Sequence, residues 1–365
     1  KYDNLGKAGL GQFAAFKNGK TTPFSRMKSM MLMEHELCFF NKIMRRIAGR
    51  MTHIELKELD RLQRYIDSAY FPLEGKESPD VEALHEISMH RWMSEYSDEI
   101  RNTILIPMLM TTFESDFKKM SARYGVSQIK KSFDIARKGG HLILGGPFAV
   151  TQDIIRHLRE KNSQIEFLAE VRAIEESGRG FDVVYNISER FAEEKAGDKE
   201  VWGKILKMVK PTKERFKYVV LALQLPAATK ITGKEFGIEY LNTKALYTQG
   251  NTVKGSELIF GPDSKSNFRV MYALLTTRDQ SIYPIDPKTN VKNIEDLFKK
   301  KEYRMLYVED ILMAMPRILP KQEFPSLEYK TKNIFLCGDF HKYPCIDTAV
   351  WTGFNVAQKI INAEK

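Results

Sequence analysis

Cysteine is scarce in this sequence, with three residues among 365. Cys38, Cys337 and Cys345 form neither a disulfide framework nor the C-x-x-C pair of a metal site. A sequence with so few cysteines favours a reducing compartment, so a cytoplasmic location is expected. The histidines and cysteines also lack the spacing of a zinc site, and no metal ligand is predicted.

Long apolar runs are missing as well. The longest candidate, Ile104 to Met110, is far shorter than the roughly 18 residues of a membrane span and is interrupted by Pro107. No secretory signal is visible. The first residue is Lys1 rather than Met, so the sequence is expected to begin inside a longer gene product or to follow processing.

Negative charge is in deficit, with 47 Asp and Glu against 57 Lys and Arg and a net charge of +10. Such a balance suits an anionic membrane, nucleic acid or an acidic partner, and it equally describes a solvated lysine-rich surface. Both interpretations stay open. No zinc spacing, RNA-binding signature or helix-turn-helix pattern is present, so nucleic acid is not an expected partner.

A basic segment from Ser25 to Met51 is predicted to be a helix. Its apolar residues form one stripe: Met33, Leu37, Phe40, Met44, Ile47 and Met51. A basic amphipathic helix can lie on an anionic membrane, which would make the protein peripheral there. A helix whose stripe faces the core has the same pattern, and that interpretation is the favoured one.

The chain's most informative segment lies near its end. Asn333 to Cys337 is predicted to be a short buried strand that ends at Gly338, and Asp339 follows it. Asp347 and Thr348 are predicted to cap a helix. The apolar face of that helix is Ala349, Val350, Phe354, Ala357, Ile360 and Ile361. A strand, a carboxylate and a helix N-terminus in this order suit a polyol beside an electron-rich ring, because the carboxylate accepts hydroxyl protons and the helix offers unpaired N–H groups. An ordinary strand–loop–helix unit with a capping Asp is the alternative.

This segment resembles the C-terminal flavin motif of the flavin amine oxidase superfamily, which includes phytoene desaturases and protoporphyrinogen oxidases. The motif there is a strand, Gly-Asp, a loop, and a small-residue helix carrying Ala-Val and Ser-Gly. This chain reads Gly338-Asp339 and Ala349-Val350-Trp351-Thr352-Gly353. The resemblance implies that Gly338 and Asp339 hold the ribityl or pyrophosphate region of FAD. It also implies that the first helical amides face the flavin ring: Ile346, Asp347, Thr348 and Ala349.

Several earlier segments resemble the superfamily in the same order. A strand-turn of the superfamily is matched by Asn18-Gly19-Lys20 and Pro23. Its substrate-domain helices are matched by Ser88 to Met93, Ile104 to Leu109 and Met120 to Ala122. Ile54 to Tyr70 is predicted to be another helix, and Gln12 to Lys17 a strand. Four residues can be interpreted either as the lining of an apolar substrate tunnel or as a methionine-filled core: Met108, Met110, Phe113 and Met120.

The middle of the chain is predicted to hold a β-hairpin. After a helix from Ala149 to Lys161, the strand Ile165 to Ile174 pairs with Phe181 to Ile187. The resemblance places Val171 against the adenine of FAD through its backbone, and a plain hairpin is the alternative. Tyr218 to Pro226 is predicted to be a continuous apolar strand of a parallel sheet.

The predicted fold class is therefore α/β, with a doubly wound FAD-binding domain joined to a mixed α+β substrate domain. The expected division is 1–135 for the helical substrate domain, 136–226 for an FAD segment, 227–325 for the substrate-domain sheet and 326–365 for a C-terminal FAD segment. Leu241 to Leu275 is predicted to supply sheet strands. Lys199 to Lys210 and Lys292 to Glu302 are predicted to be charged helices.

One element of the superfamily is missing, namely the N-terminal βαβ unit with G-x-G-x-x-G. Gly6, Gly9 and Gly11 have the spacing G-x-x-G-x-G, and no apolar strand precedes them. That unit supplies a sheet strand and the amides that meet the pyrophosphate. It is expected on a second polypeptide, on an upstream segment, or nowhere if the chain binds no flavin. Without it, Val219 to Leu223 and Ile334 to Cys337 leave an apolar sheet edge, so a covering partner is expected.

The resemblance implies an FAD-dependent oxidoreductase, or a flavin-binding subunit of one, that dehydrogenates an apolar, isoprenoid- or carotenoid-like substrate. Cys345 stands where amine oxidases of the superfamily often carry an aromatic residue, which weighs against an amine substrate, although amine oxidation stays an alternative. A non-catalytic scaffold subunit is a further alternative. His341 and Tyr343 are interpreted as loop hydrogen-bonders, and no catalytic residue is predicted.

Overall fold

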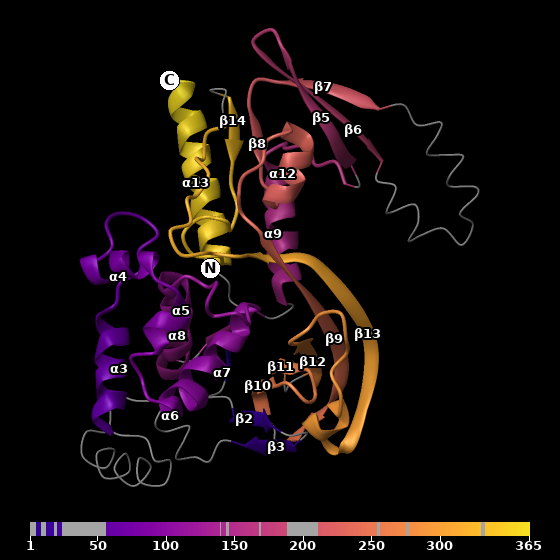
Figure 1. Cartoon of the computed structure of the whole chain (residues 1–365). Coiled ribbons are helices and arrows are strands. Elements are labelled where there is room, and N and C mark those ends of the chain that lie inside the picture. The colour runs from indigo at the N-terminus through magenta and orange to yellow at the C-terminus, as the bar shows by residue number, and fades with distance from the viewer. Residues whose placement is uncertain are drawn as a thin grey trace. The chain divides into compact units, whose positions relative to one another are not determined.

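The computed structural model describes residues 5–8, 12–17, 20–23, 56–138, 140–143, 146–167, 169–187, 211–253, 256–274, 277–329 and 333–365. The chain divides into two units (Figure 1), and it passes through each of them twice. Unit 1 contains Lys1–Leu142 and Glu239–Glu323, and unit 2 contains Ile143–Ile238 and Phe324–Lys365. The division expected from the sequence has its boundaries after residues 135, 226 and 325, whereas the two units change over after residues 142, 238 and 323.

Unit 1 contains a seven-stranded sheet in the order β13-β9-β12-β11-β10-β2-β3. Its strands are β2 (Gln12–Lys17), β3 (Lys20–Pro23), β9 (Tyr240–Thr252), β10 (Ser256–Asp263), β11 (Phe268–Leu274), β12 (Asp279–Pro284) and β13 (Phe298–Pro316). The pair β10–β2 is parallel and the other pairs are antiparallel. The strands predicted within Gln12–Lys17 and Leu241–Leu275 are confirmed.

The core of this sheet follows the two-residue period of its strands. In β12, Gln280 and Ile282 are buried while Ser281 and Tyr283 are only partly covered. The buried face forms one hydrophobic cluster, which consists of Leu246, Ile259, Phe268, Met271, Ile282, Val291, Ile294, Leu297 and Phe298. The side chains on the opposite face of the same strands do not belong to this cluster.

The helix predicted from Lys292 to Glu302 is wrong. A single turn of 3-10 helix, η5 (Ile294–Leu297), is followed at once by β13. Leu297 and Phe298 are buried in the sheet core, and the lysines that follow them are exposed on an edge strand. The run of charge therefore marks a solvated strand edge rather than a helix surface.

Short helices make up the rest of unit 1. They are α3 (Leu56–Ser68), α4 (Pro79–Ala83), η1 (Leu84–Glu86), α5 (Met89–Met93), α6 (Asp98–Ile100), η2 (Arg101–Leu105), α7 (Ile106–Leu109), η3 (Met110–Thr112) and α8 (Ala122–Lys138). The strands β1 (Leu5–Ala8) and β4 (Gly140–Ile143) form a separate pair. The helix predicted from Ile54 to Tyr70 is confirmed as α3, whereas Ser25–Met51 and Lys199–Lys210 lie outside the described residues.

Methionines fill the centre of this helical region. Met108, Met110 and Met120 are all buried, at 7%, 2% and 1% exposure. A Cβ added to Gly125 on α8 would lie 2.5 Å from the sulfur of Met89, so the glycine allows α5 and α8 to approach closely. Of the two interpretations of these methionines, the structure supports a packed core.

Unit 2 has a smaller framework of two sheets. The strands β8 (Val219–Leu221) and β14 (Ile334–Leu336) form a parallel pair. The strands β5 (Ala169–Ser177), β6 (Gly180–Ile187) and β7 (Thr212–Phe216) form an antiparallel sheet. The helices are α9 (Gly146–Glu160), α12 (Leu225–Thr232) and α13 (Ile346–Ala363). A cluster of Phe335, Cys337 and Val356 packs α13 onto β14.

The hairpin predicted in unit 2 is confirmed, and the continuous strand from Tyr218 to Pro226 is wrong. Strand β8 ends at Leu221, and α12 begins at Leu225. Pro226 lies in the first turn of α12, where its missing N–H removes no helical hydrogen bond. The apolar run therefore combines a short buried strand with the start of a helix.

Candidate functional site

The segment that the sequence singles out lies at the end of β14. The N–H of Cys337 donates to the carbonyl of Leu221 at 3.1 Å, so β14 stays paired with β8 up to this residue. Gly338 and Asp339 then leave the sheet at the carboxyl end of both parallel strands. In open parallel sheets, ligands bind outside this end of the strands.

Two buried threonines of α13 fix this segment in place. The N–H of Gly338 donates to the hydroxyl of Thr352 at 3.0 Å, and that hydroxyl lies 3.1 Å from the carbonyl oxygen of Gly338. The hydroxyl of Thr348 donates to the carbonyl of Tyr343 at 2.5 Å. Both threonines have no exposed surface, so these bonds form away from water and hold the helix against the loop.

Gly338 is required by close packing rather than by its backbone angles. A Cβ at this position would lie 2.6 Å from the ring of Phe340, which is itself fully buried. Any larger residue would push this ring or the loop aside. The Gly-Asp pair of the predicted motif therefore has a steric reason in this chain.

Two titratable groups of the loop have perturbed acidities. Burial raises the pKa of the Asp339 carboxyl above its ordinary value. Burial also lowers the pKa of His341 to about 4, so this imidazole is neutral at pH 7. Perturbed groups of this kind are concentrated at functional sites.

The Nε2 atom of His341 also lacks a hydrogen-bond partner among the described residues, although it is buried. The ring of His341 lies between the rings of Phe340 and Phe324, at centroid distances of 4.9 and 6.3 Å. An unpaired buried polar atom costs about 1–3 kcal/mol, so a ligand, a water or a further segment is expected to supply the missing bond.

Helix α13 begins at Ile346, before the cap that the sequence predicts at Asp347 and Thr348. Cys345 is its N-cap, and the Cys345 side chain makes no capping hydrogen bond. The predicted cap of Asp347 and Thr348 is therefore wrong, because both residues lie inside the first turn, followed by Ala349. The exposed carboxylate of Asp347 already complements the positive helix end, which suits this turn to the acceptor atoms of a ring better than to phosphate.

Val171 lies on β5, in a different sheet of unit 2 from Asp339. The pairing of β5 with β6 shifts between Val171 and Ala173, so Arg172 is the extra residue of a β-bulge. In addition, β5 is the edge of its sheet among the described strands. Among the described strands, the main chain near Val171 is therefore unpaired on one side.

The sheet of unit 1 carries a group of tyrosines that no local sequence pattern predicts. Tyr307 of β13 lies opposite Tyr247 of β9, and both Tyr247 and Tyr272 lie opposite Ser281 of β12. Tyr283, two residues after Ser281, is on the same face. We call Tyr247, Tyr272, Tyr283 and Tyr307 the tyrosine face. They come from four strands, so only the register of the sheet reveals them.

The rings of the tyrosine face contact one another. Tyr247 and Tyr307 are stacked with centroids 4.3 Å apart, and Tyr272 meets Tyr283 edge-on at 6.0 Å. Phe113 adds a fifth ring, 5.1 Å from Tyr283. Burial raises the pKa of Tyr247 to about 12, so its phenol stays protonated. Tyr307 is 52% exposed and Tyr272 37% exposed, so the face offers aromatic surface to a ligand.

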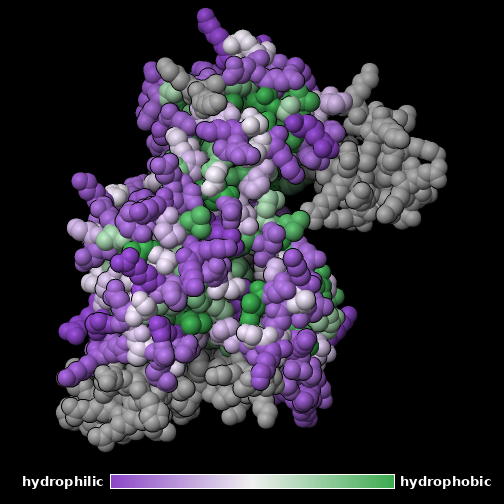
Figure 2. All heavy atoms as spheres, in the orientation of Figure 1, coloured by the Kyte–Doolittle hydropathy of each residue, from purple (hydrophilic) through white to green (hydrophobic). Residues whose placement is uncertain are grey.

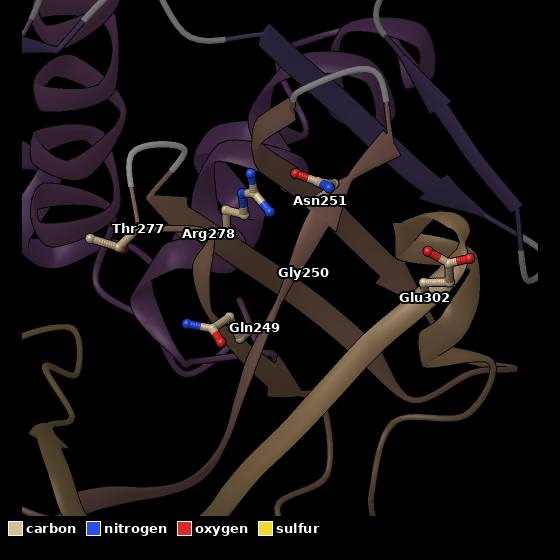
Figure 3. Close-up of a pocket in the computed structure, with 6 residues that line it drawn as sticks. All are labelled: Gln249, Gly250, Asn251, Thr277, Arg278 and Glu302. Carbon is tan, nitrogen blue, oxygen red and sulfur yellow. The ribbon is translucent and has the colours of Figure 1, made fainter.

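A polar hollow of about 420 Å³ lies elsewhere in unit 1 (Figure 3). It is lined by Gln249, Gly250, Asn251, Thr277, Arg278 and Glu302. None of the predicted flavin residues is among them, and the lining is too polar for an apolar substrate. Among the described residues there is also no group of three or more His, Cys, Asp and Glu side chains that could hold a metal ion. No helix in the same part of the chain is long and apolar enough to cross a membrane.

The chain shares its fold with several solved structures, although no protein-family model and no curated sequence matches it. A variant of putrescine oxidase aligns with a TM-score of 0.58 at 15% identity, over 99% of this chain and 82% of that one. A protein from Exiguobacterium sp. 255-15 assigned as a protoporphyrinogen oxidase aligns with a TM-score of 0.56 at 10% identity, over 98% and 81%.

A third solved structure, the CLA-producing fatty acid isomerase from P. acnes, aligns with a TM-score of 0.55 at 10% identity, over 97% of this chain and 85% of that one. At such identities the likeness concerns the fold alone. The resemblance to the flavin amine oxidase and protoporphyrinogen oxidase superfamily is thus confirmed at the level of the fold.

Proposed function

We propose that this chain forms the greater part of an FAD-dependent oxidoreductase, with Asp339 and the first turn of α13 on the flavin side. The observation that carries the proposal is a half-buried carboxyl directly after a parallel strand, two residues from a buried imidazole nitrogen without a partner. The shared fold with proteins named as oxidases supports it.

Residues of unit 2 can be matched to separate parts of FAD. Asp339 would accept hydrogen bonds from the ribityl or ribose hydroxyls, and the Nε2 atom of His341 would gain a polar partner. The amides of Ile346 to Ala349 would donate to the ring, while backbone near Val171 would take the adenine edge. Bound FAD supplies the redox chemistry, and this chain supplies position and polarity.

The proposed substrate is apolar and unsaturated, in the manner of an isoprenoid. The tyrosine face supports this because its contacting rings give a broad aromatic surface. Oxidation of an amine is a second candidate, which the same face favours through cation–π attraction and which the shared fold with putrescine oxidase also supports. Turnover of matched alkene and amine substrates distinguishes the two.

The proposed enzyme needs a further polypeptide segment carrying G-x-G-x-x-G. The parallel pair β8–β14 has no third strand among the described residues, and parallel sheets are normally covered and extended. The outer face of α13 carries an apolar stripe, which consists of Ile346, Val350, Phe354 and Ile361, at 78%, 66%, 60% and 48% exposure. A βαβ unit would extend the sheet, cover apolar surface and provide the amides for the pyrophosphate.

Flavin binding by Asp339 variants tests the assignment. In the assembly isolated from its source, we expect Asp339→Ala to weaken FAD binding about tenfold or more, because a charge-assisted hydrogen bond is lost. The matched control is Asp153→Ala, which removes a half-exposed carboxylate of α9 that pairs with Arg156 in the same unit. FAD affinity is measured by titration of flavin absorbance and fluorescence.

Three outcomes separate the alternatives. Unchanged FAD affinity in Asp339→Ala would overturn the site, and a colourless assembly would favour a non-catalytic scaffold.

Native mass spectrometry tests the partner segment. We expect a flavin-containing particle heavier than the 42.2 kDa of this chain alone, with a second polypeptide or upstream segment. A flavin-loaded particle of the chain by itself would contradict that expectation.

A further inference from the structure

The tyrosine face is followed along the sheet by a row of polar side chains. Gln249 lies two residues after Tyr247 on β9, and because side chains alternate along a strand, both lie on the same face of the sheet. Asp279 of β12 and Arg304 of β13 lie directly opposite Gln249. Tyr307 is the corresponding partner of Tyr247. The polar row therefore lies about 7 Å along the strands from the aromatic rings.

The polar row has hydrogen-bonding capacity that the sheet does not use. The Nε2 atom of Gln249 donates to Oδ1 of Asp279 at 3.0 Å, and these two side chains make no other hydrogen bond with described residues. The guanidinium of Arg304 is exposed and bonds no side chain in the described part of the chain. An amide oxygen, a carboxylate oxygen and a guanidinium are therefore available to a ligand on this face.

The polar row leads into the hollow of about 420 Å³, which is within the range of roughly 300–1,000 Å³ of small-molecule sites. Gln249 belongs to both, so the hollow begins where the aromatic rings end. Figure 3 shows that its lining residues come from β9, from the turn before β12 and from the first part of β13. The hollow adds an amide, a hydroxyl, a guanidinium and a carboxylate: Asn251, Thr277, Arg278 and Glu302.

The opposite end of the tyrosine face offers fewer available groups. Glu309 of β13 lies opposite Ala245 on the same face, and its carboxylate interacts with the phenol of Tyr247. The ring of Tyr283 is in contact with that of Phe113. In Figure 2, hydrophobic patches on the visible surface of unit 1 are small and bordered by hydrophilic residues. The end beside Gln249 is therefore where a polar group of a bound ligand finds partners.

Charge is balanced in the polar row and the hollow. Arg278 and Arg304 contribute two positive charges, and Asp279 and Glu302 contribute two negative ones. A carboxylate in this place would meet two like charges, and so would an ammonium group. A hydroxyl both donates and accepts a hydrogen bond, so it can use donors and acceptors here without bringing a net charge.

From these observations, and on the basis of the function proposed above, we propose that the substrate is an apolar chain with a hydroxylated end. The chain lies on the rings of the tyrosine face, and the hydroxylated end lies in the hollow beside Gln249 and Asp279. Aromatic surface supplies contact area for the chain. The polar row fixes the direction of the chain on the sheet, because only one of its ends can form hydrogen bonds there.

Four probes with the same isoprenoid chain test the end group: farnesol, farnesene, farnesoic acid and farnesylamine. We expect the wild-type assembly to bind farnesol at least about tenfold more tightly than farnesene, as one or two net hydrogen bonds provide. Farnesol should also bind more tightly than the acid and the amine. Binding is measured by quenching of intrinsic fluorescence. Equal affinity for farnesol and farnesene, or tighter binding of the acid or the amine, would refute the hydroxyl site.

Three variants connect the preference to the residues. Gln249→Leu should reduce the preference for farnesol over farnesene to about threefold or less. Tyr307→Leu should weaken both probes by a similar factor, because it removes aromatic surface and leaves the polar row intact. The matched control is Gln152→Leu, which changes an exposed glutamine of α9 and should alter neither affinity. Thermal melting checks that each variant is folded. A preference that Gln249→Leu leaves unchanged would contradict the assignment.

Flavin content, measured in the same preparations, separates the hydroxyl site from the proposed function. A colourless assembly that prefers farnesol would contradict the flavoenzyme and support the hydroxyl site. A flavin-containing assembly that oxidises an isoprenoid substrate but binds farnesol and farnesene equally would refute the hydroxyl site and leave the flavoenzyme intact.

Discussion

The two units of this chain differ in how completely they bury their own apolar surface. Unit 1 contains seven paired strands over one hydrophobic cluster. Unit 2 contains a parallel pair of three-residue strands beside a small antiparallel sheet. Among the described residues, ten of the seventeen exposed large hydrophobic side chains belong to unit 2, although it is the smaller unit. Unit 1 therefore buries most of its apolar surface in its own core, whereas unit 2 leaves more large apolar side chains exposed among its described residues.

The charged groups differ in the same way. In unit 1, Arg317 bridges the buried carboxylate of Glu114 and that of Glu239, both at 2.7 Å. In unit 2, the ion pairs that involve α13, such as Lys359 with Glu328, are about half exposed. Buried ion pairs are costly to break, and exposed ones contribute little. Polar interactions therefore support the packing of unit 1 more than that of unit 2.

The largest expected effect is at the centre of unit 1. Phe268→Ala removes a fully buried ring from the sheet cluster and should lower the free energy of unfolding of unit 1 by about 3–5 kcal/mol. Native-state hydrogen exchange, followed for β11 and β12, measures the loss. A loss below about 1 kcal/mol would mean that the sheet is less well packed than its burial indicates.

The next effect contrasts the two kinds of ion pair. Arg317→Ala leaves Glu114 with a buried charge and should destabilise unit 1 by about 3 kcal/mol. Lys359→Ala should change the stability of unit 2 by less than about 1 kcal/mol. Urea unfolding of the two variants, each compared with the wild type, measures both losses in the free energy of unfolding. Equal losses would break the contrast between the units.

Local patterns predicted the elements of this fold well where a single segment decides the structure. The strand and the helix between Asn333 and Ile361 were predicted correctly, apart from the helix cap, because an apolar strand, a glycine and a helical stripe are each recognisable within a few residues. The predicted helix at Lys292–Glu302 failed because exposed charge has no period on an edge strand. The break at Leu221 was missed because a run of apolar residues does not distinguish a buried strand from the start of a helix.

The candidate site could be predicted only in part, because local sequence patterns show contiguous motifs and not residues that the fold brings together. Gly338 and Asp339 form a contiguous motif, so the sequence shows them. The tyrosine face depends on the register among β9, β11, β12 and β13, which no local pattern contains. The buried Nε2 atom of His341, which has no hydrogen-bond partner among the described residues, can be recognised only from the structure.

Acid should weaken unit 2 through His341. Its pKa in the folded chain is about 4, below the ordinary 6.5, so the unfolded chain takes up a proton first as pH falls. The associated stability is complete above pH 6.5 and should be lost by about 1.4 kcal/mol per pH unit on the way to pH 4. Asp339 acts in the opposite sense, because its pKa is raised and its uptake of a proton in the folded chain offsets part of the loss at the acid end.

The pH dependence has a matched control. His341→Phe should remove most of the slope between pH 6.5 and 4, whereas the exposed His157→Phe on α9 should leave it unchanged. Hydrogen exchange of α13 and β14 at several pH values measures the slope. An identical slope in wild type and His341→Phe would show that another group governs acid sensitivity.

The smallest effect concerns the apolar stripe of α13. Phe354 is 60% exposed, so Phe354→Gln should change the free energy of unfolding of this chain alone by less than about 0.5 kcal/mol. If a G-x-G-x-x-G segment covers the stripe, the same change removes a buried aromatic contact and should weaken the assembly by about 1–3 kcal/mol. Native mass spectrometry of the assembly, with unfolding of the isolated chain as reference, measures the two values. Equal values in both settings would show that the covering segment contacts unit 2 elsewhere, since only a side chain that becomes buried on assembly gives a difference between them.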